Sequence, residues 1–132
     1  TPAVDTEAAP NTVDVAAASY TDAAGNPGGG GASAPYAVDT RSPTVEITLD
    51  DSALKTGEVA VVTFTFSEAP VGFTTGAVTA GSGTLSGPAA TADPKVYTAT
   101  LTPSVDTEAA SNTIDVAAAS YTDAAGNPGA GG

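Results

Sequence analysis

The chain of 132 residues contains no cysteine, histidine, methionine or tryptophan, and it has only seven aromatic residues. The absence of cysteine excludes disulfides and thiolate metal sites. The absence of both cysteine and histidine removes the usual nucleophile and base pairs of enzymes, which leaves only paired carboxylates of the kind that glycosidases use. Because much of the apolar content is alanine, any core is expected to be thin. We therefore expect a protein that is not an enzyme.

Positive charge is also scarce. Fifteen acidic residues stand against three basic ones, which gives a formal net charge of −12 at pH 7. This charge argues against binding to nucleic acid, whose phosphates require a basic surface, and against attraction to an anionic membrane. No apolar run is long enough to insert into a membrane. Self-repulsion opposes a compact state, so cationic partners are expected to screen the acidic groups.

The chain repeats itself. Residues 1–31 align without gaps with residues 102–132 and differ from them at only four positions. The segment SYTDAAGNPG occurs unchanged at 19–28 and at 120–129. A repeat of about 101 residues has the length of one domain, and it predicts a tandem array in which each unit has neighbouring repeats of the same polypeptide as partners.

Between the two copies, apolar and polar residues alternate with a period of two, which predicts half-buried strands. Turn residues separate these runs at the spacing typical of a β-sandwich. The sequence predicts an all-β, immunoglobulin-like Greek-key sandwich of about seven strands (A to G). The expected strands A to F lie at 43–50, 59–67, 76–81, 83–87, 94–102 and 112–121.

This order of strands also predicts the frame of the chain. Residues 1–40 are expected to be strands F and G of a preceding repeat together with a linker, and residues 41–132 a repeat without its final strand. We expect residues 33–40 to pair with the strand at 112–121. The donor would be either the same chain or a neighbouring molecule, and the second case would give head-to-tail strand exchange.

The alternation of loops in an antiparallel sandwich sorts the carboxylates into two poles. One pole is expected to hold Glu68, Asp93, the Asp123 to Asn127 loop and the incoming Asp39, and the opposite pole to hold Asp50, Asp51, Glu58, Asp106 and Glu108. The pairs Asp106 with Glu108, and Asp5 with Glu7, have an i, i+2 spacing that directs both carboxylates to one side of an extended segment.

The candidate metal ligands therefore include Asp5, Glu7, Asp50, Asp51, Asp106 and Glu108. An oxygen-only donor set suits Ca²⁺, with Mg²⁺ as second choice because it demands stricter geometry. The competing interpretation is a solvated turn, since Asp, Gly, Asn and Pro form turns without any ion. On spacing alone the two interpretations stay open for the loop at 123–129. The acidic segment around Asp50 and Asp51 is more typical of a polar hairpin turn.

The strings VTFTFSEAP, YTDAAGN and YAVDT resemble the bacterial Ig-like repeats that occur in tandem in giant RTX-type adhesins, in particular the extender repeats of ice-binding adhesins. The resemblance covers nearly the whole chain. It implies an extracellular module on the bacterial cell surface, placed between an anchor and a distal ligand-binding region, with calcium making the linkers rigid.

Carried onto matching positions, the resemblance implies that Asp39, Glu68, Asp123 and Asn127 are the junction ligands for calcium. Asp22 and Asn26 are their counterparts in the preceding unit. The implied function is that of a structural spacer in cell adhesion. The alternative is direct binding of a glycan or of ice by short rows of threonine, although ordinary solvent-facing strands explain those rows as well.

Overall fold

The computed structural model describes all residues 1–132, and the chain divides into two compact units, Thr1–Arg41 and Ser42–Gly132, called unit 1 and unit 2 below. The division follows Arg41, one residue after the boundary that the sequence predicts. Apart from one short 3₁₀ turn, all of its regular secondary structure consists of strands. None of its helical segments has the length and hydropathy of a membrane span.

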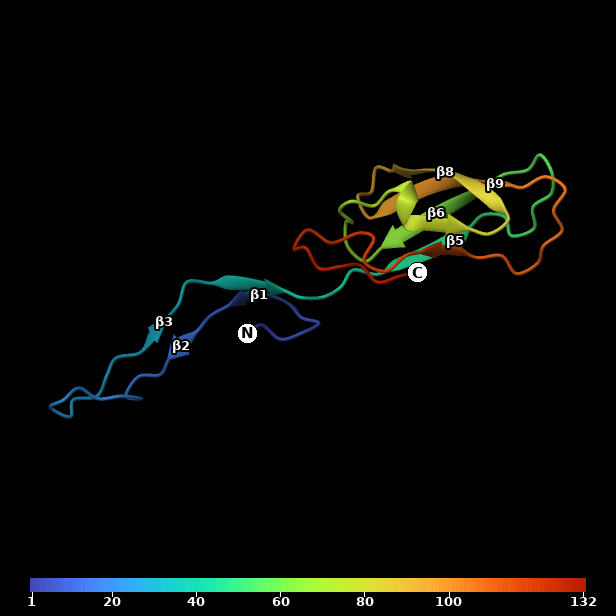
Figure 1. The fold of residues 1–132 in the computed structure, drawn as a ribbon. Helices are drawn as coiled ribbons and strands as arrows, with labels where there is room; N and C mark the ends of the chain where they lie inside the picture. The colour runs from blue at the N-terminus through green and yellow to red at the C-terminus, as the bar shows by residue number, and fades with distance from the viewer. The chain divides into compact units, whose positions relative to one another are not determined.

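Unit 2 contains six strands and one 3₁₀ turn: β5 (Val45–Leu49), β6 (Ala60–Phe66), η1 (Thr75–Ala77), β7 (Val78–Ala80), β8 (Gly83–Ala90), β9 (Val96–Pro103) and β10 (Ile114–Val116). Four of them form an antiparallel sheet in the order β5-β6-β9-β8, which Figure 1 shows, and β7 pairs with β10 in a second sheet. In immunoglobulin lettering this is the pairing A-B-E-D and C-F. The chain is an all-β protein with a β-sandwich, as predicted.

The core of unit 2 follows from the period-two pattern. The four alternate residues Ala60, Val62, Phe64 and Phe66 of β6 are all buried, whereas Val61 between them is 42% exposed. Five aromatic rings meet edge to face in this core, which concentrates its apolar area at one end of β6: Phe64, Phe66, Phe73, Tyr97 and Tyr121.

Strand β10 is shorter than the sequence predicts. The expected strand covered residues 112–121, but pairing ends at Val116 and a turn follows. Ala119 adopts a φ of 58°, and Ser120 Oγ donates a hydrogen bond of 2.6 Å to the carbonyl of Ala117. This local hydrogen bond competes with the ladder, because a hydroxyl can satisfy a backbone group that a strand would otherwise pair.

Unit 1 is an antiparallel ribbon of four short strands: β1 (Glu7–Asn11), β2 (Asp14–Val15), β3 (Gly31–Ala32) and β4 (Tyr36–Asp39). Strand β1 pairs with β4, and β2 pairs with β3. Figure 1 shows β2 and β3 side by side. Pro35 precedes β4, as expected for a proline at a strand start. No residue of unit 1 is buried, so the ribbon has no hydrophobic core of its own.

The pairing of β4 corrects one prediction. Residues 33–40 were expected to pair with the strand at 112–121, but in this chain Val38 pairs with Ala8 and Asp39 with Glu7. The prediction is therefore wrong for pairing within the chain. Strand β4 pairs with β1 of unit 1 instead, because the acidic loop between them reverses the chain and closing so short a loop costs little entropy.

Candidate metal centre

The loop at Tyr121–Gly129 is closed by its own backbone. Gly129 N–H donates to the carbonyl of Tyr121 at 2.8 Å, Asp123 N–H to the carbonyl of Asn127 at 3.1 Å, and Gly126 N–H to the carbonyl of Asp123 at 3.3 Å. Gly126 has a φ of 94°, a conformation that glycine adopts without strain. The turn residues of the repeated motif therefore build a compact hairpin loop.

Asp123 braces this loop from inside. Its Oδ1 accepts a hydrogen bond of 2.9 Å from the backbone N–H of Asn127, and its Oδ2 accepts one of 2.8 Å from Nδ2 of the same residue. Only 2% of the Asp123 surface is exposed. Sequence reasoning predicted both residues as separate metal ligands and missed this contact, although an Asp four residues before an Asn in a glycine-containing turn is a signal for it.

Burial by itself would raise the pKa of Asp123, since it disfavours the charged form, but the hydrogen bonds from the side chain and backbone of Asn127 and from Gly126 and Ala125 outweigh it. The net effect lowers the pKa of Asp123 below its ordinary value. The carboxyl group is therefore ionised at neutral pH, and a negative charge lies buried at this end of unit 2.

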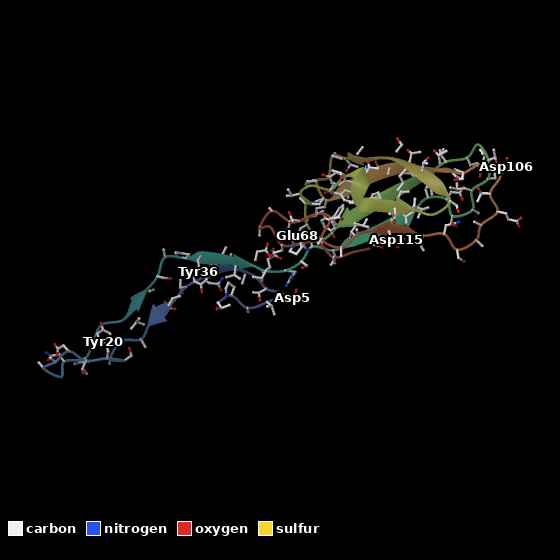
Figure 2. The ribbon with its side chains drawn as sticks, viewed as in Figure 1. Asp5, Tyr20, Tyr36, Glu68, Asp106 and Asp115 are labelled. Atoms are coloured by element: carbon white, nitrogen blue, oxygen red, sulfur yellow. The ribbon has the colours of Figure 1, made fainter.

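A second carboxylate lies beside Asp123. The loop after β6 pairs with the Tyr121–Gly129 loop, because Val71 N–H donates to the carbonyl of Thr122 at 2.7 Å and Thr122 N–H donates back to Val71 at 3.0 Å. This pairing brings a carboxylate oxygen of Glu68 within 4.8 Å of one of Asp123. Figure 2 shows Glu68 at one end of unit 2 and Asp106 at the other, in agreement with the predicted two poles.

The same end of unit 2 is tied to the start of its first strand. Tyr121 Oη lies 2.9 Å from the carbonyl oxygen of Ala130 and 3.2 Å from that of Pro43, and Ala130 N–H donates to Pro43 at 2.8 Å. Burial raises the pKa of Tyr121, so the hydroxyl keeps its proton for these carbonyls. The residues that enter unit 2 are thus fixed beside the Asp123 loop.

The Asp123 carboxylate carries the negative charge that attracts a cation. Its Oδ1 and Oδ2 each accept a hydrogen bond from Asn127, and the backbone N–H groups of Gly126 and Ala125 also donate to it. Carboxylate oxygens are the hard donors that Ca²⁺ prefers, and the chain has no imidazole or thiolate to favour zinc or copper. Glu68 and Asp123 therefore fit one side of a calcium site.

The other predicted ligands of unit 2 are not gathered in this way, because no three of its acidic side chains lie close enough to share one ion. Asp50 Oδ1 accepts a hydrogen bond of 2.7 Å from Val61 N–H, and Asp51 Oδ1 accepts one of 2.9 Å from Ala53 N–H. Both carboxylates thus support the hairpin between β5 and β6. Asp106 and Glu108 are exposed in the loop after β9.

In unit 1, Asp5 and Glu7 flank Arg41, whose nitrogen atoms lie 4.0 Å and 3.5 Å from their respective carboxylate oxygens. The Arg41 guanidinium therefore supplies the positive charge that was expected from a metal ion at Asp5 and Glu7. Asp39 is the last residue of β4, and its Oδ1 accepts a hydrogen bond of 3.2 Å from Arg41 N–H.

The first copy of the acidic loop has the same internal geometry. Asp22 Oδ1 accepts from Asn26 N–H at 2.9 Å and its Oδ2 accepts from Asn26 Nδ2 at 2.9 Å. The Asn26 side chain and then the Asn26 backbone lower the pKa of Asp22. Both residues are exposed. The loop conformation is thus encoded in the ten repeated residues, while the burial of its aspartate depends on the sandwich.

Comparison with known protein families places the fold among described domains. A family model described as a bacterial Ig-like domain matches residues 39–132. No curated protein and no solved structure shows a significant match to the chain.

Proposed function

The chain belongs to the bacterial Ig-like domain family, and from this premise we propose that it is a structural extender module of a tandem-repeat adhesin on the bacterial cell surface, made rigid by calcium at the junction between repeats. The repeat in the sequence supports the array. The acidic composition, with a net charge of −12, supports a role for cations.

One observation carries the proposal: the ionised carboxylate of Asp123 is buried within 4.8 Å of the Glu68 carboxylate. Two like charges at this separation repel each other, and the repulsion is stronger where water is excluded. A bound Ca²⁺ removes this repulsion. It also links the loop after β6 to the loop after β10, each of which supplies one carboxylate.

We assign a third carboxylate to Asp39. It precedes Pro43 by four residues, and four residues of extended chain reach about 14 Å at most. Because Pro43 is held against Tyr121 and Ala130, Asp39 is tethered within reach of the Asp123 loop. An ion bound by Asp39 together with Glu68 and Asp123 would restrict the linker, and Asn127 adds a side-chain oxygen beside them.

The arrangement of threonines on the sheet favours this structural role over direct binding of a ligand. The outer face of the β5-β6-β9 sheet aligns Thr48, Thr63 and Thr98 across three strands, but the neighbouring rows pair Glu46 with Thr65 and Val61 with Thr100. The threonines therefore do not form an uninterrupted array that would present a regular surface to ice or a glycan.

Thermal unfolding tests the proposal. At calcium concentrations about tenfold above its dissociation constant, which extracellular modules place near 10⁻⁴–10⁻³ M, binding to the folded state adds about 1.4 kcal/mol. For a domain of this size, the melting temperature should rise by roughly 6–10 °C and return to its starting value on addition of chelator. Equimolar Mg²⁺ should give a smaller rise.

Single variants locate the ion. Glu68→Gln and Asp39→Asn should each reduce the calcium-induced rise in melting temperature. In chelator, Glu68→Gln should melt at or above the temperature of the parent chain, because it removes the repulsion with Asp123. Asp115→Asn, an exposed position on β10, is the matched control and should respond to calcium like the parent chain. A melting temperature that is insensitive to calcium in the parent chain would overturn the calcium role.

A further inference from the structure

The backbone of Asn127 is held on both sides within the Asp123 loop. Its N–H donates to Asp123 Oδ1 at 2.9 Å, and its carbonyl accepts from Asp123 N–H at 3.1 Å. The next residue, Pro128, is bridged to Thr122, which is also bridged to Val71. Only the side chain of Asn127 can therefore change its position while the loop stays closed.

The donors to the Asp123 carboxylate are of two kinds. Gly126, Ala125 and Asn127 donate to it through backbone N–H groups, which belong to the closed loop. The side chain of Asn127 donates through Nδ2, which lies 2.8 Å from Oδ2 of Asp123. Nδ2 is thus the donor that can leave Asp123 without any change in the course of the backbone.

This amide group lies where negative charge is concentrated. The carboxylates of Glu68 and Asp123 lie within 4.8 Å of each other. Because Asp123 is 2% exposed, water screens their repulsion poorly. The hydrogen atoms of Asn127 Nδ2 carry partial positive charge and reduce the repulsion at Oδ2 of Asp123. The amide thus supplies a part of the positive charge that a cation would supply in full.

The same side chain also carries an oxygen. Oδ1 and Nδ2 of asparagine are both bonded to Cγ, so a half turn about the Cβ–Cγ bond exchanges their positions. A cation on Oδ2 of Asp123 would be repelled by the Nδ2 hydrogens beside it. After a half turn, Oδ1 of Asn127 takes the place of Nδ2 and offers a hard oxygen of the kind that Ca²⁺ prefers. One orientation therefore suits Asp123 alone, and the other suits Asp123 with a cation.

The first copy of the loop shows that the loop itself sets the donating orientation. Asn26 donates to Asp22 through its N–H and through Nδ2, each at 2.9 Å, although both residues are exposed. Asp22 belongs to no group of three acidic side chains that could share an ion, whereas Asp123 has Glu68 beside it. The two asparagines therefore have the same orientation in different charge environments, which makes Asn26 an internal control.

We propose that Asn127 positions Asp123 and that its amide reverses on cation binding: Nδ2 holds Asp123 without the ion, and Oδ1 replaces Nδ2 when the ion binds. This inference rests on the calcium role proposed above and specifies how the site changes between its two states. The loop backbone keeps the same course in both states, so the change is confined to one side chain. The reversal breaks one hydrogen bond to a buried carboxylate, which lowers the affinity of the site for calcium.

NMR tests the reversal directly. In an isotopically labelled chain kept in chelator, a scalar coupling across the hydrogen bond should join Nδ2 of Asn127 to Cγ of Asp123, and another should join Asn26 to Asp22 in the same way. Saturating calcium should abolish the first coupling and leave the second. A coupling at Asn127 that persists after calcium has raised the melting temperature would overturn the reversal and leave the calcium role standing. If calcium changes neither the melting temperature nor the Asp123 signal, both fail.

Asn127→Asp distinguishes this role from that of a simple structural brace. The variant keeps the side-chain shape and an oxygen, but it lacks Nδ2 and adds a charge beside Asp123. In chelator its melting temperature should lie roughly 10 °C below that of the parent chain. Saturating calcium should restore it to at least the parent value, because the added oxygen and charge strengthen binding. Asn26→Asp, the matched control, should leave the melting of unit 2 unchanged in both conditions. An Asn127→Asp chain that is as stable as the parent in chelator, or that stays destabilised in calcium while the parent responds, contradicts the proposal.

Discussion

Gly129 lies flat against the ring of Tyr121, so closely that a Cβ atom on residue 129 would stand 2.2 Å from Cζ. The ring cannot retreat, because Tyr121 is 2% exposed and its hydroxyl is held by carbonyl oxygens of Ala130 and Pro43. The last glycine of the repeated motif is therefore required for close approach. It lets the acidic loop close over the aromatic core and fixes the position of Asp123.

Substitution of this glycine measures the constraint. Gly129→Ala should destabilise unit 2 by about 2 kcal/mol and lower its melting temperature by roughly 10 °C, because the added methyl group displaces a buried ring. The matched control is Gly28→Ala, where a Cβ atom would lie 2.2 Å from Cζ of Tyr20. Tyr20 is 54% exposed and can rotate away, so this variant should unfold like the parent chain.

The hydroxyl of Tyr121 makes a separate contribution. Tyr121→Phe keeps the ring in the core but removes the contacts with Ala130 and Pro43, and it should cost about 1 kcal/mol in chemical denaturation. Tyr20→Phe should have no measurable effect, since no hydrogen bond joins the Tyr20 hydroxyl to the rest of the chain. A Tyr121→Phe variant as stable as the parent would show that the hydroxyl does not anchor the entry to β5.

Alkaline pH should weaken the same anchor. Because burial raises the pKa of Tyr121 in the folded state, its contribution to stability is complete below the unfolded value of about 10 and is lost as the pH rises through the folded value. The parent chain should therefore lose more stability above pH 10 than Tyr121→Phe does. Parallel curves for the two proteins would contradict this assignment.

Strand positions could be predicted from the sequence because each strand of the large sheet has one buried face. The alternation in β6 and β9 reports that face directly, and Ala99 and Leu101 are buried as their spacing indicates. The end of β10 could not be predicted in this way. The alanines after Val116 carry no alternating signal, and the turn there depends on a serine hydroxyl and on a positive φ at Ala119.

The candidate site was predictable in outline. Alternation of loops predicted that Glu68 and Asp123 share one end, and they do. The pairing of Val71 with Thr122, which brings them together, depends on loop backbone that has no sequence signature. The charge of Arg41 beside Asp5 and Glu7 was missed for a similar reason, since the pairing of β1 with β4 had to be known before Arg41 could be placed.

The two acidic loops provide a matched test of how burial and hydrogen bonding set a pKa. In chelator, NMR titration of the parent chain should show the pKa values of both Asp22 and Asp123 below the ordinary range. Asn127→Ala removes the side-chain hydrogen bond to Asp123 and leaves the group buried, so its pKa should rise. Asn26→Ala should raise the pKa of Asp22 by less, because Asp22 is exposed to water.

This titration is linked to acid stability. A folded pKa below the unfolded value means that Asp123 stabilises the fold above the unfolded value of about 3.9, and that this contribution is lost as the pH falls through the folded value. Asp123→Asn should therefore show a weaker loss of stability on acidification than the parent chain. A parent chain with the same acid sensitivity as the variant would mean that another group controls this range.

Hydrogen exchange should separate the two units. Amides in the central strands β6 and β9 are paired within a sheet that covers the aromatic core, so they exchange only through large-scale opening of unit 2. Amides of β1 to β4 belong to a ribbon without a buried residue, and two-stranded ribbons are marginally stable in water. We expect their protection to be lower by about 100-fold or more in dilute solution.

Equal protection of β4 and β6 in a monomeric sample would show that the ribbon is stabilised beyond its own hydrogen bonds. If protection of β4 instead rises with protein concentration, its strand has gained a partner from another copy.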